Sequence, residues 1–370
     1  MLIVRQDTGI NYNSIAEKFK GISFDKALFF DIETTGFAAK STKLYLIGCV
    51  YADAPTGNFT SIQWFLDNYD DESELIKAFA QFSKDFDTLI HFNGQGFDIP
   101  YVEAKCQKYN ISFDFSVFNH IDLYKYTSKL KNLFKTENLK QKTMEQFFDL
   151  NREDIFSGGD LIAVYHEYMD KKDERALEFL LLHNYEDIKG MITLLDILTY
   201  NAILTGSYSF TSMSVEVSGS PNDMIRKEAI IELKLDTRVP KRVSFGHNDC
   251  YITAFDDKLK LKINVYTEEL KYFYPDYKDY YYLPVEDRAI HKSVAFYVDK
   301  NYRVRAKAAN CYSKKTGEFL PEFDEIVTPY FKKEYGDKKL YFELTEDFTE
   351  NPDVIYEYAK HIVEWLMRVK

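Results

Sequence analysis

The stretch Phe29-Phe30-Asp31-Ile32-Glu33-Thr34-Thr35-Gly36 is the most informative segment of this 370-residue chain. An apolar run ends there in two acids, which predicts a buried strand over Ala27–Asp31 that carries carboxylates at its end. Side chains at i and i+2 of a strand share a face, so Asp31 and Glu33 are expected to project together. Two carboxylates that close repel each other unless a cation lies between them. An all-oxygen pair suits Mg²⁺ or Mn²⁺ and not zinc, although a lone Asp-x-Glu is more often a solvent-facing strand end.

Two further segments place acids where such a strand would need them. His91-Phe92-Asn93-Gly94-Gln95-Gly96-Phe97-Asp98 is a second strand that runs into a glycine-rich turn and ends in Asp98. An acid there is also a routine first residue of a helix. His183-Asn184-Tyr185-Glu186-Asp187 lies inside a helical run, and its spacing puts His183 and Asp187 on one helix face. Taken alone, such a pair is usually only solvent-facing.

The pattern around these segments predicts an α/β domain over residues 1–205, in which a mixed sheet has helices packed on its faces. Residues 123–204 are expected to be mainly helical, with a break at Ser157-Gly158-Gly159. The other strands and helices expected in this domain are strands over Lys43–Tyr51, Asn58–Phe65, Thr88–Phe92 and Ser116–Asp122 and helices over Leu75–Phe86 and Ile99–Tyr109.

A second domain is predicted over residues 206–370, because serine and glycine cluster over Leu204–Pro221 in the manner of a domain boundary. Period-two alternation over Lys258–Val265 and Arg303–Ala308 predicts strands, so this domain should be smaller and mainly β. Helical spacing of apolar residues predicts one closing helix over Pro352–Arg368.

The composition fits a folded protein: it includes 29 Tyr and 30 Phe, and the formal net charge is −12. That charge excludes a strongly basic DNA-coating protein but not a nucleic-acid enzyme, because bound metal ions bring phosphate close to carboxylates. The four cysteines are far apart and form no CxxC pair, which argues against a zinc site and a disulfide framework. No signal peptide or membrane span is readable, so we expect a cytoplasmic protein without a membrane partner.

The three acidic segments together resemble the motifs of the DEDD superfamily of 3′–5′ exonucleases, over roughly residues 25–200. The first family motif, Asp-x-Glu on a strand, is matched by Asp31 and Glu33. The second, Asn-x-x-x-Phe-Asp, is matched by the segment that ends in Asp98, and the third by Asp187 on a late helix. The chain looks closest to a bacterial branch of predicted exonucleases, in which a helical insert like Glu145–Tyr168 carries a stretch like Arg152-Glu153-Asp154-Ile155.

The resemblance implies a ribonuclease H-like fold and a metal-dependent 3′–5′ exonuclease that hydrolyses DNA or RNA from a single-stranded 3′ end. It implies two Mg²⁺ or Mn²⁺ ions per site, held by Asp31, Glu33, Asp98 and Asp187. The family's third motif has either His five residues before the Asp or Tyr four before it. Here His183 stands four before Asp187, and Tyr185 two before it. We expect His183 to be the general base, since imidazole titrates near neutral pH, with orientation of Asp187 as the alternative.

Two other functions are weighed against the exonuclease. A catalytically weak or inactive nucleic-acid-binding protein of the same fold is favoured by the unusual position of His183. The full set of four carboxylates argues against it, because a degenerate site is expected to lose some of them. A nucleotidyltransferase is disfavoured, since the chain lacks a Gly-Ser signature followed by an acidic pair.

The second domain offers three surfaces whose roles the sequence leaves open. The tyrosine-rich segment Tyr272–Tyr282 could stack on unpaired bases or pack on its own domain. Arg303, Arg305 and Lys307 could bind phosphates or form an ordinary basic face. The alternating lysines at 258, 260 and 262 fit an exposed face or a protected sheet edge better than a binding site.

Overall fold

The computed structural model describes residues 1–154, 156, 158–218 and 226–369 of the chain. These residues form two compact units, one of residues 1–131 and 135–198, the other of residues 132–134 and 199–370. Apart from residues 132–134, the second unit begins at residue 199, slightly before the predicted boundary at 205/206. That residues 206–370 form an independent domain stays a prediction.

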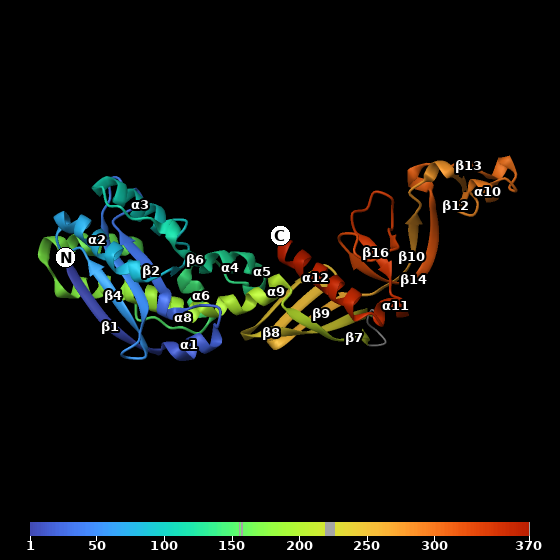
Figure 1. The fold of residues 1–370 in the computed structure, drawn as a ribbon. Helices are drawn as coiled ribbons and strands as arrows, with labels where there is room; N and C mark the ends of the chain where they lie inside the picture. The colour runs from blue at the N-terminus through green and yellow to red at the C-terminus, as the bar shows by residue number, and fades with distance from the viewer. Residues whose placement is uncertain (155, 157, 219–225, 370) are drawn as a thin grey trace. The chain divides into compact units, whose positions relative to one another are not determined.

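The first unit is built on a six-stranded sheet with the order β1-β4-β3-β2-β5-β6 (Figure 1). β2 pairs antiparallel with β3 and parallel with β5, so the sheet is mixed, as the sequence predicts. Its strands are β1 (Leu2–Asn11), β2 (Ala27–Thr34), β3 (Leu44–Asp53), β4 (Asn58–Phe65), β5 (Thr88–His91) and β6 (Asn119–Asp122).

Helices cover both faces of this sheet. Neighbouring side chains of β2 point to opposite sides, so they contact different helices. Phe30 stacks on Phe79 of α2, with ring centroids 5.1 Å apart. Asp31 instead accepts a hydrogen bond from Asn184 of α8. The helices of the first unit are α1 (Tyr12–Lys18), α2 (Glu72–Phe82), α3 (Asp98–Tyr109), α4 (Leu123–Lys129), α6 (Gln141–Phe147), α7 (Gly158–Lys171) and α8 (Glu174–Leu194). The short helix α5 (Lys131–Phe134) has its first residue in the first unit and its other three in the second.

The helical stretch Glu174–Thr205 is long and apolar enough, by length and composition, to cross a membrane. Within the protein, however, 61% of its apolar window is buried. Since a core helix passes the same test, this is weak evidence for a membrane span.

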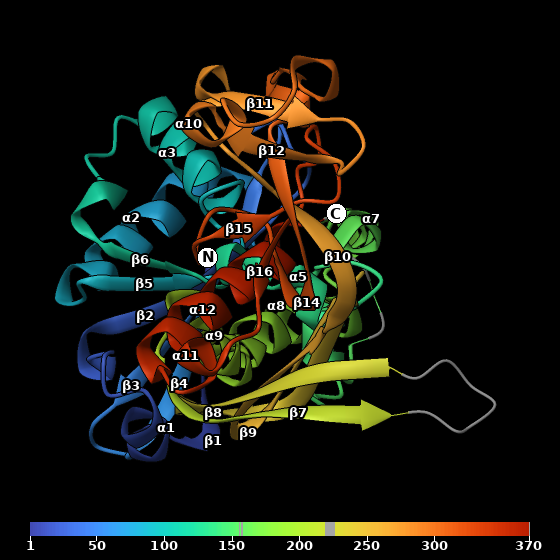
Figure 2. The ribbon, with the colours of Figure 1, turned by 90° about the vertical axis from the view of Figure 1, so that its right-hand side faces the viewer.

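The second unit contains three further sheets, with the orders β7-β8-β9, β10-β14-β16-β15 and β12-β11-β13. Figure 2 shows β7, β8 and β9 as neighbouring long strands. α12 packs on them through a buried face that includes Ile355, Ala359 and Ile362. The elements are α9 (Asn201–Thr205), β7 (Tyr208–Ser218), β8 (Arg226–His247), β9 (Cys250–Asn264), β10 (Tyr266–Phe273), β11 (Tyr280–Leu283), β12 (Arg288–His291), α10 (Lys292–Ala295), β13 (Val304–Arg305), β14 (Tyr312–Glu322), β15 (Tyr330–Phe331), β16 (Leu340–Glu343), α11 (Glu346–Thr349) and α12 (Pro352–Arg368).

Several elements differ from the expectation. β1 was not predicted, and the serine-rich segment expected to be a boundary loop forms β7, which pairs with β8 over ten positions. The predicted strand Arg303–Ala308 shortens to the two residues of β13. The break expected at Ser157–Gly159 falls partly outside the described residues, since Ser157 is not described and Gly158 begins α7.

The tyrosine-rich segment of the second unit packs largely on itself. Tyr274 and Tyr280 stack with ring centroids 4.5 Å apart, and the hydroxyl of Tyr282 donates to Asp287. The guanidinium groups of Arg303 and Arg305 lie over the ring of Tyr281, 5.0 and 4.5 Å from its centroid. These contacts favour the packing interpretation for the tyrosines that make them.

The lysines of β9 also have neighbours on their own sheet. Lys260 pairs with Glu232 at 3.3 Å, and Lys262 with Glu228 at 3.8 Å. This cross-strand pairing fits the interpretation of an ordinary charged face.

Candidate active site

The site begins on β2, where Asp31 and Glu33 share the face that α8 covers. Opposite Asp31 on β3 lies Gly48. A Cβ atom on Gly48 would stand 1.9 Å from Oδ1 of Asn184, so only glycine leaves room for this side chain. Asn184 Nδ2 then donates to Asp31 Oδ2 at 2.9 Å. The close approach of helix and sheet therefore fixes the first carboxylate.

Asp98 reaches the same place from the turn between β5 and α3. Asn93 adopts a left-handed backbone, with φ of 63°, and its N–H donates to Asp122. The chain turns there into α3, and Asp98 is its first residue. Its Oδ1 accepts a hydrogen bond from the backbone N–H of Ile32, at 3.3 Å. Since Ile32 lies between the two acids of β2, Asp98 belongs to the same cluster.

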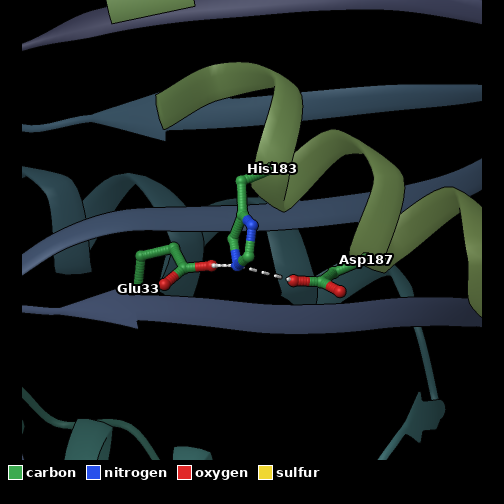
Figure 3. A group of neighbouring side chains, drawn as sticks. All are labelled: Glu33, His183 and Asp187. Carbon is green, nitrogen blue, oxygen red and sulfur yellow. Dashed lines mark ion pairs between the residues drawn. The ribbon is translucent and has the colours of Figure 1, made fainter. Parts of the chain in front are cut away.

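His183 and Asp187 complete the cluster from α8. His183 Nε2 lies 3.4 Å from Glu33 Oε1 and 3.3 Å from Asp187 Oδ2 (Figure 3). The three side chains come from the strand β2 and from two positions one turn apart on α8, as the spacing predicts. Tyr185 instead lines a separate pocket with Gln63 and Lys189 and takes no part in this cluster.

Further charged residues contact this cluster from outside it, and the sequence did not predict these contacts. Asp154 Oδ2 lies 2.7 Å from His183 Nδ1 and 2.6 Å from Lys142 Nζ. Arg152 Nη2 lies 2.6 Å from Asp187 Oδ1 and also pairs with the buried Glu145. The stretch Arg152-Glu153-Asp154-Ile155 was the only signal for these residues, and it does not say what they contact.

Burial and the nearby negative charges raise the pKa of three carboxylates in the cluster. Burial raises the pKa of Asp31, and the charges of Asp187 and Asp98 raise it further. Burial and the same two neighbours raise the pKa of Glu33. Burial also raises the pKa of Asp98 to about 7, against hydrogen bonds that lower it. The cluster thus holds more negative charge than its protein surroundings neutralise, which is the condition for binding a cation.

The donor set fits a divalent metal ion. Ligand atoms of Glu33, His183 and Asp187 all lie within 4.8 Å of one another. Asp31 and Asp98 add carboxylate oxygens beside them. The carboxylate oxygens suit Mg²⁺ or Mn²⁺, whereas the imidazole of His183 is a ligand that Zn²⁺ also accepts.

An open pocket of about 510 Å³ lies next to two of these carboxylates. Phe92 and Tyr124 contribute rings to its wall, with centroids 5.9 Å apart, and Lys140 contributes a cation. The residues that line it are Asp31, Phe92, Asn93, Tyr124, Leu139, Lys140, Gln141 and Asp187. The carboxylate cluster is therefore reachable from a pocket that offers aromatic surface and positive charge.

Comparison with known proteins places the first unit in a fold class. Residues 28–199 match the family model described as the RNase_H superfamily, a span that contains every predicted site residue. With the mixed sheet and its flanking helices, this shows a ribonuclease H-like fold followed by a mainly β unit, as predicted.

Two solved structures of exonuclease I are weakly similar. E. coli exonuclease I in complex with a dT13 oligonucleotide is 10% identical with a TM-score of 0.30, covering 56% of this chain and 54% of that chain. The zinc-ion-bound form of an E. coli ExoI–ssDNA complex is 11% identical with a TM-score of 0.27 and the same coverage. The chain thus spans about half the length of these proteins, and so low a likeness carries no argument about activity. No curated protein matches by sequence.

Proposed function

We propose that the protein is a metal-dependent 3′–5′ exonuclease that hydrolyses the phosphodiester bonds of DNA or RNA. One observation carries the proposal: Asp31 and Glu33, Asp98, and Asp187 come from three separate segments and form one cluster, in which burial and mutual repulsion raise the pKa of Asp31 and Glu33. Burying uncompensated carboxylates together destabilises a fold, so such a cluster is expected only where a cation offsets its charge.

The four carboxylates would hold two divalent ions. Bound there, such ions supply an activated water and neutralise charge on the scissile phosphate and the leaving 3′ oxygen. The protein's own part is to keep the oxygens in place, through Asn184 on Asp31 and the backbone N–H of Ile32 on Asp98.

His183 is assigned the role of proton acceptor. Its Nδ1 faces Asp154, and its Nε2 faces the space between Glu33 and Asp187. A neutral imidazole with that orientation can take a proton from water at Nε2. The carboxylates around it would hold the metal ions.

The pocket beside Asp31 and Asp187 is assigned to the terminal nucleotide of the substrate. The rings of Phe92 and Tyr124 provide surface on which an unpaired base can stack, and Lys140 can contact a phosphate. An unpaired end suits this pocket better than a duplex, because stacking on protein rings requires a base that has left its own helix.

The test is hydrolysis of single-stranded DNA and RNA, labelled at the 5′ end or at the 3′ end, by the full-length protein with Mn²⁺. We expect the 3′ label to appear as a mononucleotide from the start, while the 5′ label gives a ladder of shortening products. EDTA should stop both. Binding without hydrolysis at any Mn²⁺ concentration would favour the alternative, a binding protein of the same fold.

A further inference from the structure

We infer that Asp154 is a positioning residue that fixes the orientation and the tautomer of His183. The inference rests on the proposed function, because it assigns the base of that reaction a partner. Asp154 belongs to the α6–α7 loop, of which residues 148–154 and 156 are described.

The backbone of this loop is hydrogen-bonded to α8 near His183. The N–H groups of Glu153 and Asp154 donate to the two carboxylate oxygens of Glu186, at 2.8 and 2.9 Å. Arg152 adds ion pairs to Asp187 and to the buried Glu145. The loop is thereby held to the same helix that carries His183.

The carboxylate of Asp154 is itself held in one orientation. Its Oδ1 accepts from the backbone N–H of Phe156 at 2.9 Å. Its Oδ2 lies 2.6 Å from Lys142 Nζ and 2.7 Å from His183 Nδ1. Donors therefore occupy both oxygens, and the side chain is only 1% exposed. An ionised Asp154 can only accept from Nδ1, so that nitrogen must carry the proton.

This contact decides what His183 can do at its other nitrogen. With the proton on Nδ1, a neutral ring presents a lone pair at Nε2, toward Glu33 and Asp187. Without Asp154 the ring could rotate or carry its proton on Nε2, where it could no longer accept one. Asp154 thus acts on the reaction through His183 and touches neither substrate nor metal.

Asp154→Asn tests the inference with almost no change in volume. The N–H of Phe156 keeps the amide oxygen as its acceptor, and Lys142 keeps the carbonyl oxygen of Phe156, so the amide nitrogen takes the place of Oδ2 and donates to Nδ1. The ring proton then moves to Nε2, as in other His–Asp pairs in which the acid becomes an amide. We expect turnover with Mn²⁺ to fall ~10²–10⁴-fold, as for loss of a general base, with KM largely unchanged.

Two measurements separate positioning from a structural role. The double variant Asp154→Asn/His183→Ala should be no slower than His183→Ala, because Asp154 acts only through His183. If the loss of turnover in the double variant is the product of the losses in the two single variants, the inference is wrong. In metal-free protein labelled with ¹⁵N-histidine, the His183 ring should change tautomer in Asp154→Asn; an unchanged tautomer would also overturn it.

Glu153→Gln is the matched control, since it removes one charge from an exposed position of the same loop. It should keep the turnover and the His183 tautomer of the wild type. If the wild type hydrolyses no nucleic acid, the proposed function fails, whereas the tautomer measurement still decides the role of Asp154.

Discussion

His183 lies within 3.4 Å of carboxylate oxygens from three different segments, so its replacement distinguishes a base from an orienting group. If it is the base, His183→Ala should lower turnover by ~10²–10⁴-fold at saturating Mn²⁺. Calorimetric Mn²⁺ affinity should then stay close to that of the wild type. If excess Mn²⁺ restores turnover instead, His183 only orients Asp187, and the proton acceptor is another group.

Asp98 makes the stability of the metal-free protein depend on pH. Burial raises its pKa to about 7, so the folded state favours the protonated form. That contribution is complete below the pKa of the unfolded chain, near 3.8, and is lost as the pH rises through about 7. Asp98→Asn cannot ionise and should therefore lack this loss.

Urea unfolding in EDTA at pH 5 and pH 8 measures the effect. The free energy of unfolding of Asp98→Asn, relative to the wild type, should be higher at pH 8 than at pH 5. Comparing the two proteins at each pH removes the contributions of titrating groups that lie away from Asp98. An identical pH dependence for both proteins would contradict the assigned direction of the pKa shift.

The sequence predicted the residues of the cluster but not the residues that hold them in place. Asp31 and Glu33 follow an apolar run on a strand, Asp98 follows the turn after another strand, and His183 and Asp187 share a helix face. Local spacing is therefore enough to predict them. Asp154 contacts His183 across 29 positions of the chain, from a loop of no regular period. Asn184 is recognisable only when its approach to Gly48 is known. Such contacts depend on how elements pack, which spacing does not encode.

Among the elements, the approach of α8 to the sheet is the one on which the site depends. A Cβ atom at Gly48 would collide with Asn184, whose amide is also held by Gln63 of β4 at 3.0 Å. Gly48→Ala should therefore destabilise the protein by about 1–3 kcal/mol, as overpacked cores do. It should also weaken Mn²⁺ binding, because Asn184 can no longer hold Asp31.

Gly21→Ala is the control for this prediction, since nothing lies within 4 Å of its Cβ position. Thermal unfolding and Mn²⁺ titration of both variants make the comparison. Equal stability of Gly48→Ala and Gly21→Ala would show that α8 can move away from the sheet without cost.

The elements that sequence patterns missed share a physical reason. β1 has no clean alternation, and its pairing with β4 places it at an edge of the sheet, where burial is partial. β7 is rich in serine and mostly exposed, so its hydrogen bonds to β8, rather than apolar burial, define it as a strand. In contrast, α12 has a strong apolar face, and its predicted bounds are those observed.

For the whole molecule, the structure sharpens the predicted division of the chain. We expect residues 199–370 to fold as a fragment separate from the first unit. A fragment starting at Thr199 should be more stable than one starting at Gly206, because only the first retains Tyr200. The Tyr200 hydroxyl donates to Lys241 O at 2.8 Å and accepts from Lys241 N at 3.0 Å.

Circular dichroism melts of fragments 199–370 and 206–370 test this division. Cooperative unfolding of both, with the higher melting temperature for 199–370, is expected. If both fragments are unfolded, the second unit is an extension of the first core and not an independent domain.

The most direct test of the central claim is hydrolysis by full-length Asp31→Asn. This variant loses one proposed metal ligand without a change in volume, so folding and thermal unfolding should stay close to the wild type. With Mn²⁺ and 3′-labelled single-stranded DNA or RNA, we expect release of mononucleotides by the wild type and none by Asp31→Asn. Asp25→Asn, an exposed acid before β2, should behave as the wild type. Undiminished hydrolysis by folded Asp31→Asn in saturating Mn²⁺ would contradict the claim that this carboxylate cluster is the nuclease centre.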